Sequence, residues 1–169
     1  TQFMTSTAAV RHYIEPGAKQ AFAMNAVEPG DPAALAAFVT WGKTNFPADK
    51  YAIVIAGHGD GWKGVLLNRA GDDFLTMSEV DTGLAALGQQ FETVVFYACL
   101  MGMVEVGYQI ADHAKYMVAS QQVMWTGLPW QDWLDRLKAN PAWAGGELAD
   151  SAAQRISQHN EDIIFQPPS

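Results

Sequence analysis

Two uninterrupted apolar runs, "YAIVIA" at 51–56 and "TVVFY" at 93–97, place the strongest constraint on how this chain folds. Both runs are rich in β-branched and aromatic residues, and polar residues do not alternate with the apolar ones. This pattern is typical of strands that are buried on both faces, which occur in parallel sheets covered by helices. The run "KYMVAS" at 115–120 is a third candidate for such a strand.

Helical patterns separate these strands. Asp31 as N-cap and Pro32 at the first helical position predict a helix start, because a proline there loses no hydrogen bond. A core-facing stripe follows at helical spacing, and Pro47 ends the helix; the stripe consists of Leu35, Phe38, Val39 and Gly42. Between the first and second runs, Ser78 and Asp81 resemble a capping box. That helix would carry Val80, Leu84 and Leu87 inward and end near Gly88.

A third helix is expected directly after Cys99, with one apolar face and a polar face that carries Glu105. The apolar face would comprise Leu100, Met103, Val104, Gly107, Tyr108 and Ala111. Two further helices are expected near 131–138 and 146–159, the second with Leu148, Ala149, Ala152 and Ile156 inward. Strands that alternate with helices predict an α/β sandwich whose largely parallel central sheet is flanked by helices.

Composition narrows the class of protein. With 169 residues, 49% hydrophobic and 17% charged, the chain suits one globular domain over 1–169. The 18 acidic against 10 basic residues give a formal charge of −8, which disfavours nucleic acid as a partner. Apolar runs are far shorter than the roughly 20 residues that span a bilayer, and no intact signal peptide is visible. We therefore expect no membrane span.

Two of the predicted strands end in reactive side chains, His58 and Cys99. Loops beyond the carboxyl ends of parallel strands are where sites of α/β sheets gather, so neighbouring strands would bring these two residues together. A nearby imidazole and the N-terminus of a following helix would both favour the thiolate of Cys99. The N–H of Gly59, unshielded by a side chain, would face a developing oxyanion. Taken singly, however, a lone cysteine at a strand end is more often a small core residue, and a lone histidine is more often structural.

The stretches "HGDGW" at 58–62 and "YACLMGMVEVGYQI" at 97–110 together resemble the clostripain-type cysteine peptidases of the caspase-like clan. The resemblance covers about residues 30–138 and includes "DPAALAAFVTWGKTNFPADKYAIVI" and "YMVASQQVMWTGLPWQDWL". It implies a caspase-like three-layer fold, truncated here at both ends. It also implies a cysteine endopeptidase that acts on peptides or proteins, in a secreted or cell-envelope location.

The roles that this resemblance implies fall on matching positions. His58 would be the general base and acid, Cys99 the nucleophile that forms a thioacyl intermediate, and Gly59 with the Cys99 N–H the oxyanion donors. Further substrate-binding residues would be Tyr97, Ser120, Gln121 and Trp125, with Asp60 as a candidate beside them. Self-cleavage, known in the family, would fall after Arg69 or Lys63 in the loop "WKGVLLNRAGDD".

This sequence also departs from the family pattern. Tyr97 stands where family members often have an aspartate that suits a basic substrate residue, and Asp60 and Asp132 are candidates to replace that charge. A catalytically inactive homologue that serves as a binding or scaffold module is therefore the alternative. A small-ligand domain is disfavoured because no G-x-G-x-x-G loop follows a strand.

Metal sites are weakly indicated. No cofactor is required by the proposed chemistry, and single histidines and one cysteine without a Cys-x-x-Cys or His-x-x-x-His pair predict no zinc site. Asp60, Asp72 and Asp73 are candidate calcium ligands, although the regular spacing of oxygen ligands that defines an EF-hand loop is missing.

Overall fold

A computed structural model describes residues 10–15, 17–23, 30–68, 73–124 and 129–164. The strands are β1 (Val10–Glu15), β2 (Ala18–Ala23), β3 (Ala52–Ala56), β4 (Val65–Asn68), β5 (Asp73–Leu75), β6 (Phe91–Tyr97) and β7 (Ala114–Ala119). The helices are α1 (Pro32–Asn45), α2 (Met77–Ala85), α3 (Val104–Gln109), α4 (Trp130–Ala139), α5 (Gly145–Ile164) and the short 3-10 helix η1 (Gly61–Lys63).

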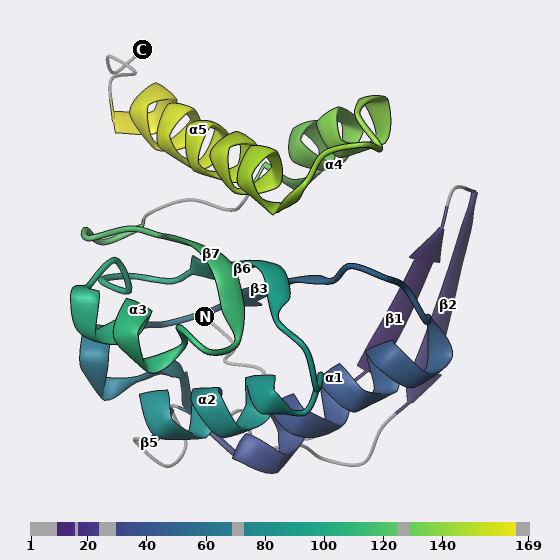
Figure 1. Ribbon diagram of the computed structural model, residues 1–169. Coiled ribbons are helices and arrows are strands. Elements are labelled where there is room, and N and C mark those ends of the chain that lie inside the picture. The colour runs from purple at the N-terminus through teal and green to yellow at the C-terminus, as the bar shows by residue number, and fades with distance from the viewer. Residues whose placement is uncertain (1–9, 16, 24–29, 69–72, 125–128, 165–169) are drawn as a thin grey trace.

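Three layers form the body of the molecule (Figure 1). The central sheet has the strand order β3-β6-β7, and both pairings are parallel. Helices α1, α2 and α3 cover one face of this sheet, and α4 and α5 cover the other (Figure 1). The predicted α/β sandwich with a parallel sheet flanked by helices is confirmed. Within the described part of the chain, no helix is long and apolar enough to cross a bilayer.

Each of the three central strands contributes side chains to two separate cores. Strand β6 is buried along nearly its whole length, whereas β7 buries only Val118, so the expectation that 115–120 is a strand buried on both faces was wrong. Val94 and Phe96 of β6 belong to the core under α1, α2 and α3, whereas Val95 belongs to the core under α4 and α5. Side chains alternate across a strand, so an uninterrupted apolar run fills both cores at once. This two-sided burial is the physical reason for the "TVVFY" pattern.

Sequence and structure agree on the start of α1 and differ on the start of α2. The Asp31 side chain accepts a hydrogen bond from the Ala33 N–H at 2.9 Å, as expected of an N-cap. Helix α2, however, begins two residues earlier than predicted, with a capping box formed by Thr76 and Glu79. The prediction that Ser78 is the N-cap was therefore wrong. Thr76 and Glu79 have the same three-residue separation as Ser78 and Asp81, and the buried Met77 is the first residue of the helix.

The expected apolar faces of two helices need correction. Phe38 of α1, predicted to face the core, is 47% exposed. In α3, Val104 and Tyr108 are 81% and 84% exposed, while Val106 and Ile110 are buried. The short α3 carries apolar residues around most of its circumference, so spacing alone does not define the inward face.

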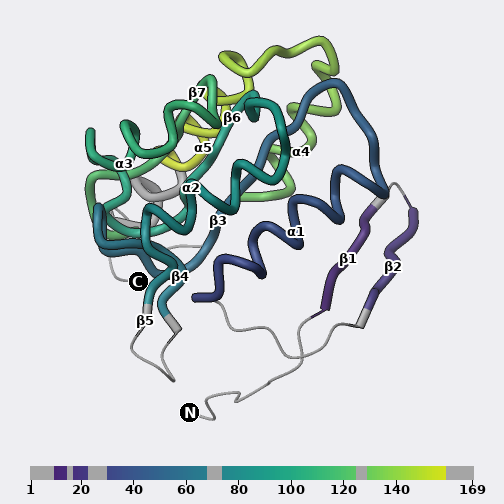
Figure 2. Tube along the Cα trace, turned by 60° about the horizontal axis from the view of Figure 1, so that its bottom comes forward, coloured from purple at the N-terminus to yellow at the C-terminus, as the bar shows by residue number. Residues whose placement is uncertain are grey.

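The N-terminal strands stand apart from the central sheet. Strands β1 and β2 form an antiparallel hairpin, which lies beside the C-terminal end of α1 (Figure 2). On residue pattern alone, the stretch "AFAMNAVEPG" at 21–30 would be a turn, but its first three residues belong to β2. Residues 24–29 lie outside the described residues.

Helix α5 is tied to the sheet by polar contacts near its first turn. The buried Thr93 hydroxyl donates to the Gly145 carbonyl at 2.9 Å. Glu92 accepts from the Gly145 N–H at 3.3 Å and from the Lys115 ammonium at 2.5 Å. The hydrogen bond from Lys115 holds the pKa of Glu92 below its ordinary value. These contacts join β6, β7 and α5 at the edge of the sheet where β6 begins.

Candidate active site

The parallel register places His58 and Cys99 at equivalent positions beyond neighbouring strands. Ala56 is paired with Tyr97 at the ends of β3 and β6, and each reactive residue follows two positions later. The ladder continues past this pair, because the Gly57 N–H donates to the Tyr97 carbonyl at 3.2 Å. Neighbouring strands lie about 4.8 Å apart. The two loops therefore leave the sheet side by side.

Gly59 closes the space between the two loops. A Cβ atom at this position would lie 2.5 Å from the Cys99 carbonyl oxygen and 3.0 Å from the Ala98 Cβ. Such a contact is too short for any side chain, so the close approach of the backbones requires glycine. The tight packing holds the loop that carries His58 against the loop that carries Cys99.

The loop after His58 is stabilised by a short return of the chain. The Leu66 N–H donates to the His58 carbonyl at 2.7 Å, and the Asp60 N–H donates to the Gly64 carbonyl at 3.0 Å. These bonds flank an isolated bridge between Gly59 and Val65 and do not use the Gly59 N–H. That N–H is therefore compatible with the oxyanion role expected of it. The His58 side chain itself is exposed.

The chain turns sharply after Cys99. Leu100 has a φ of +64°, a left-handed conformation that is rare for a residue other than glycine. Such conformations cost about 1–3 kcal/mol and are concentrated at functional sites. Helix α3 begins only at Val104, so the expectation that a helix N-terminus directly follows the cysteine was wrong. The turn places four loop residues between the thiol and the helix.

The segment after β7 meets the cysteine from the other side. The Ser120 carbonyl accepts from the Gly102 N–H at 2.8 Å, and the Met124 N–H donates to the Cys99 Sγ at 3.3 Å. Ser120, Gln121 and the partly buried Cys99 therefore lie at one edge of the sheet; that the first two bind substrate stays a prediction. Sequence patterns did not reveal Met124, because its contact with Cys99 spans 25 positions.

The two acidic residues proposed to supply charge for a basic substrate residue, Asp60 and Asp132, already have partners. Asp60 lies 2.8 Å from the Lys63 ammonium, in an exposed pair within one helical turn. Asp132, in the first turn of α4, pairs with Arg136 at 3.4 Å and with Arg155 of α5. The main described contact of Asp132 thus joins two helices.

Tyr97 ends β6 and is partly buried, and its side chain packs against the core under α4 and α5. It lies on the face of the sheet opposite to the core under α1, α2 and α3. Trp125, Arg69 and Asp72 lie outside the described residues, as does the side chain of Asp73. Among the side chains that the structure describes, no group of three or more His, Cys, Asp or Glu is placed to hold a metal ion.

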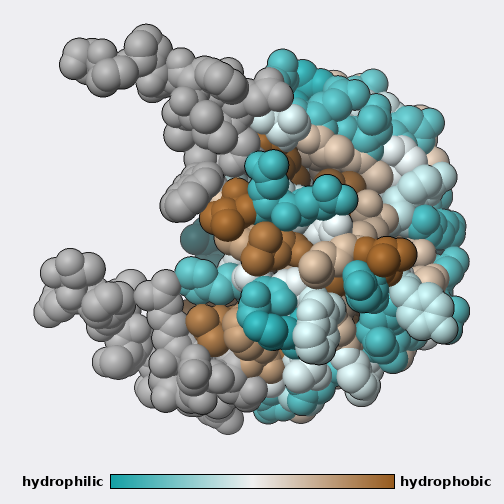
Figure 3. All heavy atoms as spheres, turned by 90° about the vertical axis from the view of Figure 1, so that its left-hand side faces the viewer, coloured by the Kyte–Doolittle hydropathy of each residue, from teal (hydrophilic) through white to brown (hydrophobic). Residues whose placement is uncertain are grey.

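Apolar side chains are exposed in the loops at this edge. Met103 is 38% exposed and Val123 is 45% exposed, and the space-filling view of this side shows hydrophobic side chains among hydrophilic ones (Figure 3). Trp62 of η1 is 61% exposed. The surface around the two loops is therefore apolar as well as polar.

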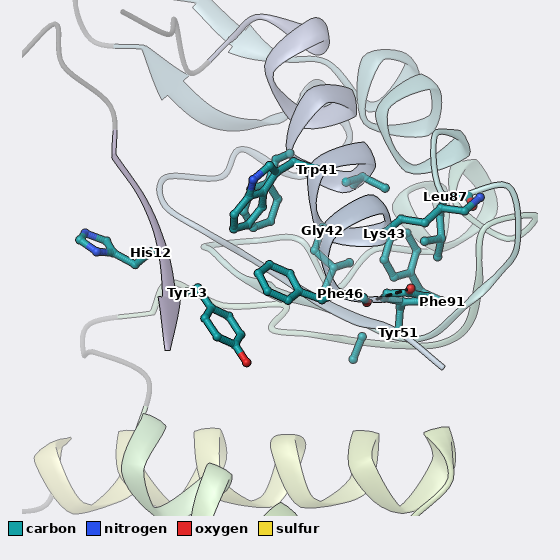
Figure 4. A pocket seen from close by; sticks show the side chains of 13 residues that line it. His12, Tyr13, Trp41, Gly42, Lys43, Phe46, Tyr51, Leu87 and Phe91 are labelled. Atoms are coloured by element: carbon teal, nitrogen blue, oxygen red, sulfur yellow. Dashed lines mark hydrogen bonds between the residues drawn. The ribbon is translucent and has the colours of Figure 1, made fainter. Parts of the chain in front are cut away.

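A separate aromatic pocket lies at the opposite edge of the sheet. It has a volume of about 280 Å³, and its walls include Tyr13, Trp41, Phe46 and Phe91. The rings of Tyr13 and Phe46 are stacked with centroids 4.3 Å apart (Figure 4). Because Phe91 begins β6 whereas Cys99 follows its end, this pocket is distinct from the region of His58 and Cys99.

Comparison with known proteins identifies relatives of this arrangement. The model of the clostripain family matches residues 16–162. Clostripain of Hathewaya histolytica is 34% identical over 131 residues, which are 65% of this chain and 25% of that protein. A secreted cysteine protease from Bacteroides thetaiotaomicron, solved with an irreversible peptide inhibitor, superposes with a TM-score of 0.70 at 23% identity. That match covers 87% of this chain and 43% of the other.

A second solved structure, an inactive zymogen protease from Parabacteroides distasonis, has a TM-score of 0.53 at 21% identity. That match covers 72% of this chain and 36% of the Parabacteroides chain. This chain thus spans less than half the length of each of these relatives. The match to the family model extends over most of the 169 residues. The chain belongs to the clostripain family.

Proposed function

We propose that this chain carries the catalytic residues of a cysteine endopeptidase, with Cys99 as nucleophile and His58 as general base and acid. The observation that carries the proposal is the register: His58 and Cys99 each follow the paired residues Ala56 and Tyr97 by two positions. The Gly59 contact with the Cys99 carbonyl supports it, because it holds the two loops together. Membership of the clostripain family agrees with this chemistry.

The proposed reaction begins with transfer of the thiol proton from Cys99 to the imidazole of His58. The thiolate then attacks the carbonyl carbon of a peptide bond, and the N–H groups of Gly59 and Cys99 stabilise the oxyanion. His58 returns the proton to the departing amine, which leaves a thioester on Cys99. Water, deprotonated by His58, hydrolyses the thioester and restores the thiol.

The substrate would be a peptide or protein that lies across the loops of this edge. Ser120, Gln121 and Tyr97 are the described candidates for contact with it, together with Asp60. Since Asp60 is already paired with Lys63, binding of a basic substrate residue would require exchange of that partner. Cleavage after Lys63 or Arg69, calcium binding by Asp60, and secretion as described for the Bacteroides relative remain predictions.

The decisive experiment compares the rate of Cys99 alkylation by iodoacetamide from pH 5 to 9 in the parent and in His58→Ala. A fast reaction below neutral pH that collapses in the variant would support a histidine-activated thiolate, and hydrolysis of a peptide library would then define the preferred residues. A slow reaction, unchanged by the variant, together with no peptide cleavage, would favour the inactive binding module. Incubation with and without calcium tests the ion.

A further inference from the structure

The segment Ser120–Met124 is held against the loop that follows Cys99. The Leu100 N–H donates to the Gln122 carbonyl at 3.2 Å, next to the bond between Gly102 and Ser120. A Cβ atom on Gly102 would lie 2.8 Å from the Gln121 backbone nitrogen, so the two backbones are in close contact. The Ser120 hydroxyl also accepts from the Gln122 N–H at 3.0 Å. This packing fixes the position of Val123 and Met124.

Met124 contacts the sulfur of Cys99 through both of its backbone polar groups. Its N–H donates to Sγ at 3.3 Å, and its carbonyl oxygen lies 3.9 Å from Sγ, where it accepts a weak hydrogen bond from the thiol. Ionisation of the thiol removes the longer contact. The shorter contact becomes charge-assisted, because an N–H then donates to a negatively charged sulfur. The carbonyl contact favours the neutral thiol but is long and weak, so the shorter, charge-assisted bond from the N–H outweighs it and favours the thiolate.

The other groups around Cys99 do not replace this donor. Helix α3 begins at Val104 and has six residues, so it provides no helix terminus at the sulfur. The titratable side chains on the neighbouring loops are His58, Asp60, Lys63 and Tyr97, and the segment Ser120–Met124 contains none. Asp60 and Lys63 compensate each other in their exposed pair.

We propose that the backbone N–H of Met124 is a catalytic group that stabilises the Cys99 thiolate. Its importance for peptide hydrolysis rests on the proposed function, whereas its effect on the reactivity of the sulfur does not. Under this proposal the thiol proton passes to His58, and the charge left on Sγ is stabilised by the Met124 N–H. The segment after β7 thereby contributes to the nucleophile as well as to the substrate surface.

The test removes this N–H by Met124→Pro and measures alkylation of Cys99 by iodoacetamide at pH 6.5 and pH 10. We expect the ratio of the rate at pH 6.5 to the rate at pH 10 to fall about tenfold, because a hydrogen bond to a charged group is lost. Val123→Pro is the matched control, since it introduces the same ring one residue earlier and retains the Met124 N–H. Its ratio should stay within about twofold of the parent, since no charge-assisted bond is removed.

A second variant separates loss of the N–H from strain caused by the proline ring. In the ester analogue, an oxygen replaces the backbone nitrogen of Met124 and the side chain is unchanged. We expect the same fall in the ratio with an unchanged unfolding midpoint. A ratio equal to that of the parent in the ester analogue would overturn the proposal, whether or not Met124→Pro folds.

These results are distinguishable from a failure of the proposed function. If His58→Ala abolishes fast alkylation while the ester analogue retains the parental ratio, the dyad stands and the role of Met124 is refuted. If His58→Ala has no effect and no peptide is cleaved, the peptidase proposal fails. A lower ratio in the ester analogue would in that case still establish Met124 as a donor to the thiolate.

Discussion

Gly59→Ala should disturb the contact between the His58 loop and the Cys99 loop while leaving the rest of the fold in place. The added methyl group would lie 2.5 Å from the Cys99 carbonyl oxygen, 2.9 Å from the Met101 Sδ and 3.0 Å from the Ala98 Cβ. The methionine side chain can rotate, but the backbone oxygen moves only with its loop. Overpacking of this kind typically costs about 1–3 kcal/mol.

That cost sets the expected size of the effect in urea unfolding. With a denaturant dependence of about 2 kcal/mol per molar urea, the midpoint should fall by about 0.5–1.5 M. Displacement of the His58 loop should also lower the rate of Cys99 alkylation at pH 6.5 by at least about tenfold. Gly42→Ala is the matched control, because no atom lies within 4 Å of its added methyl group. Gly42 lies inside α1, so its replacement by alanine should raise the free energy of unfolding by about 0.5–1 kcal/mol.

The reasoning would be refuted by a Gly59→Ala protein that unfolds at the same urea concentration as the parent and alkylates at the same rate. That result would mean that the two loops separate without loss of stability or reactivity. A loss of stability with an unchanged alkylation rate would refute only the link between loop contact and thiol activation. A loss of stability in Gly42→Ala would show that substitution of glycine itself, rather than the contact, causes the effect.

Three further predictions concern the scaffold. Thr93→Val should lower the free energy of unfolding by about 1–2 kcal/mol, because the Gly145 carbonyl loses its buried donor; an unchanged urea midpoint would contradict this. Thr76→Ala should cost about 0.5–2 kcal/mol through loss of the capping box, whereas Ser78→Ala should change the unfolding free energy by less than about 0.5 kcal/mol; equal effects would contradict the Thr76 cap. The pKa of Glu92 is lowered in the folded state, so the ionised carboxylate should stabilise the protein at pH values above the unfolded-state pKa near 4.5, and this contribution should be lost as the pH falls through the folded-state pKa. The thermal unfolding midpoint of Glu92→Gln should therefore depend less on pH between pH 3 and 7 than that of the parent. The same pH dependence in both proteins would refute the assignment.

Local sequence patterns determined much of the scaffold. The run at 93–97 is a strand buried on both faces, and the run at 51–56 is a strand that buries Ile53 and Ile55 in one core and packs Val54 against the other. Asp31 caps α1, as its position before Pro32 predicted. These features follow from hydrogen bonds and side-chain alternation within a few residues. The motifs around His58 and Cys99 likewise identified the family before the fold was known.

Tertiary packing decided the features that depend on distant partners. Apolar spacing in α3 allowed more than one inward face, and the neighbouring elements selected Val106 and Ile110 rather than Val104 and Tyr108. The pairing of Asp132 with Arg155 joins two helices, and the contact between Met124 and Cys99 joins loops 25 positions apart. Local periodicity carries no information about such contacts, because they exist only after the sheet has placed its loops at one edge. The sequence alone therefore identified the family and the candidate residues His58 and Cys99, whereas the tertiary structure determined which backbone groups surround them.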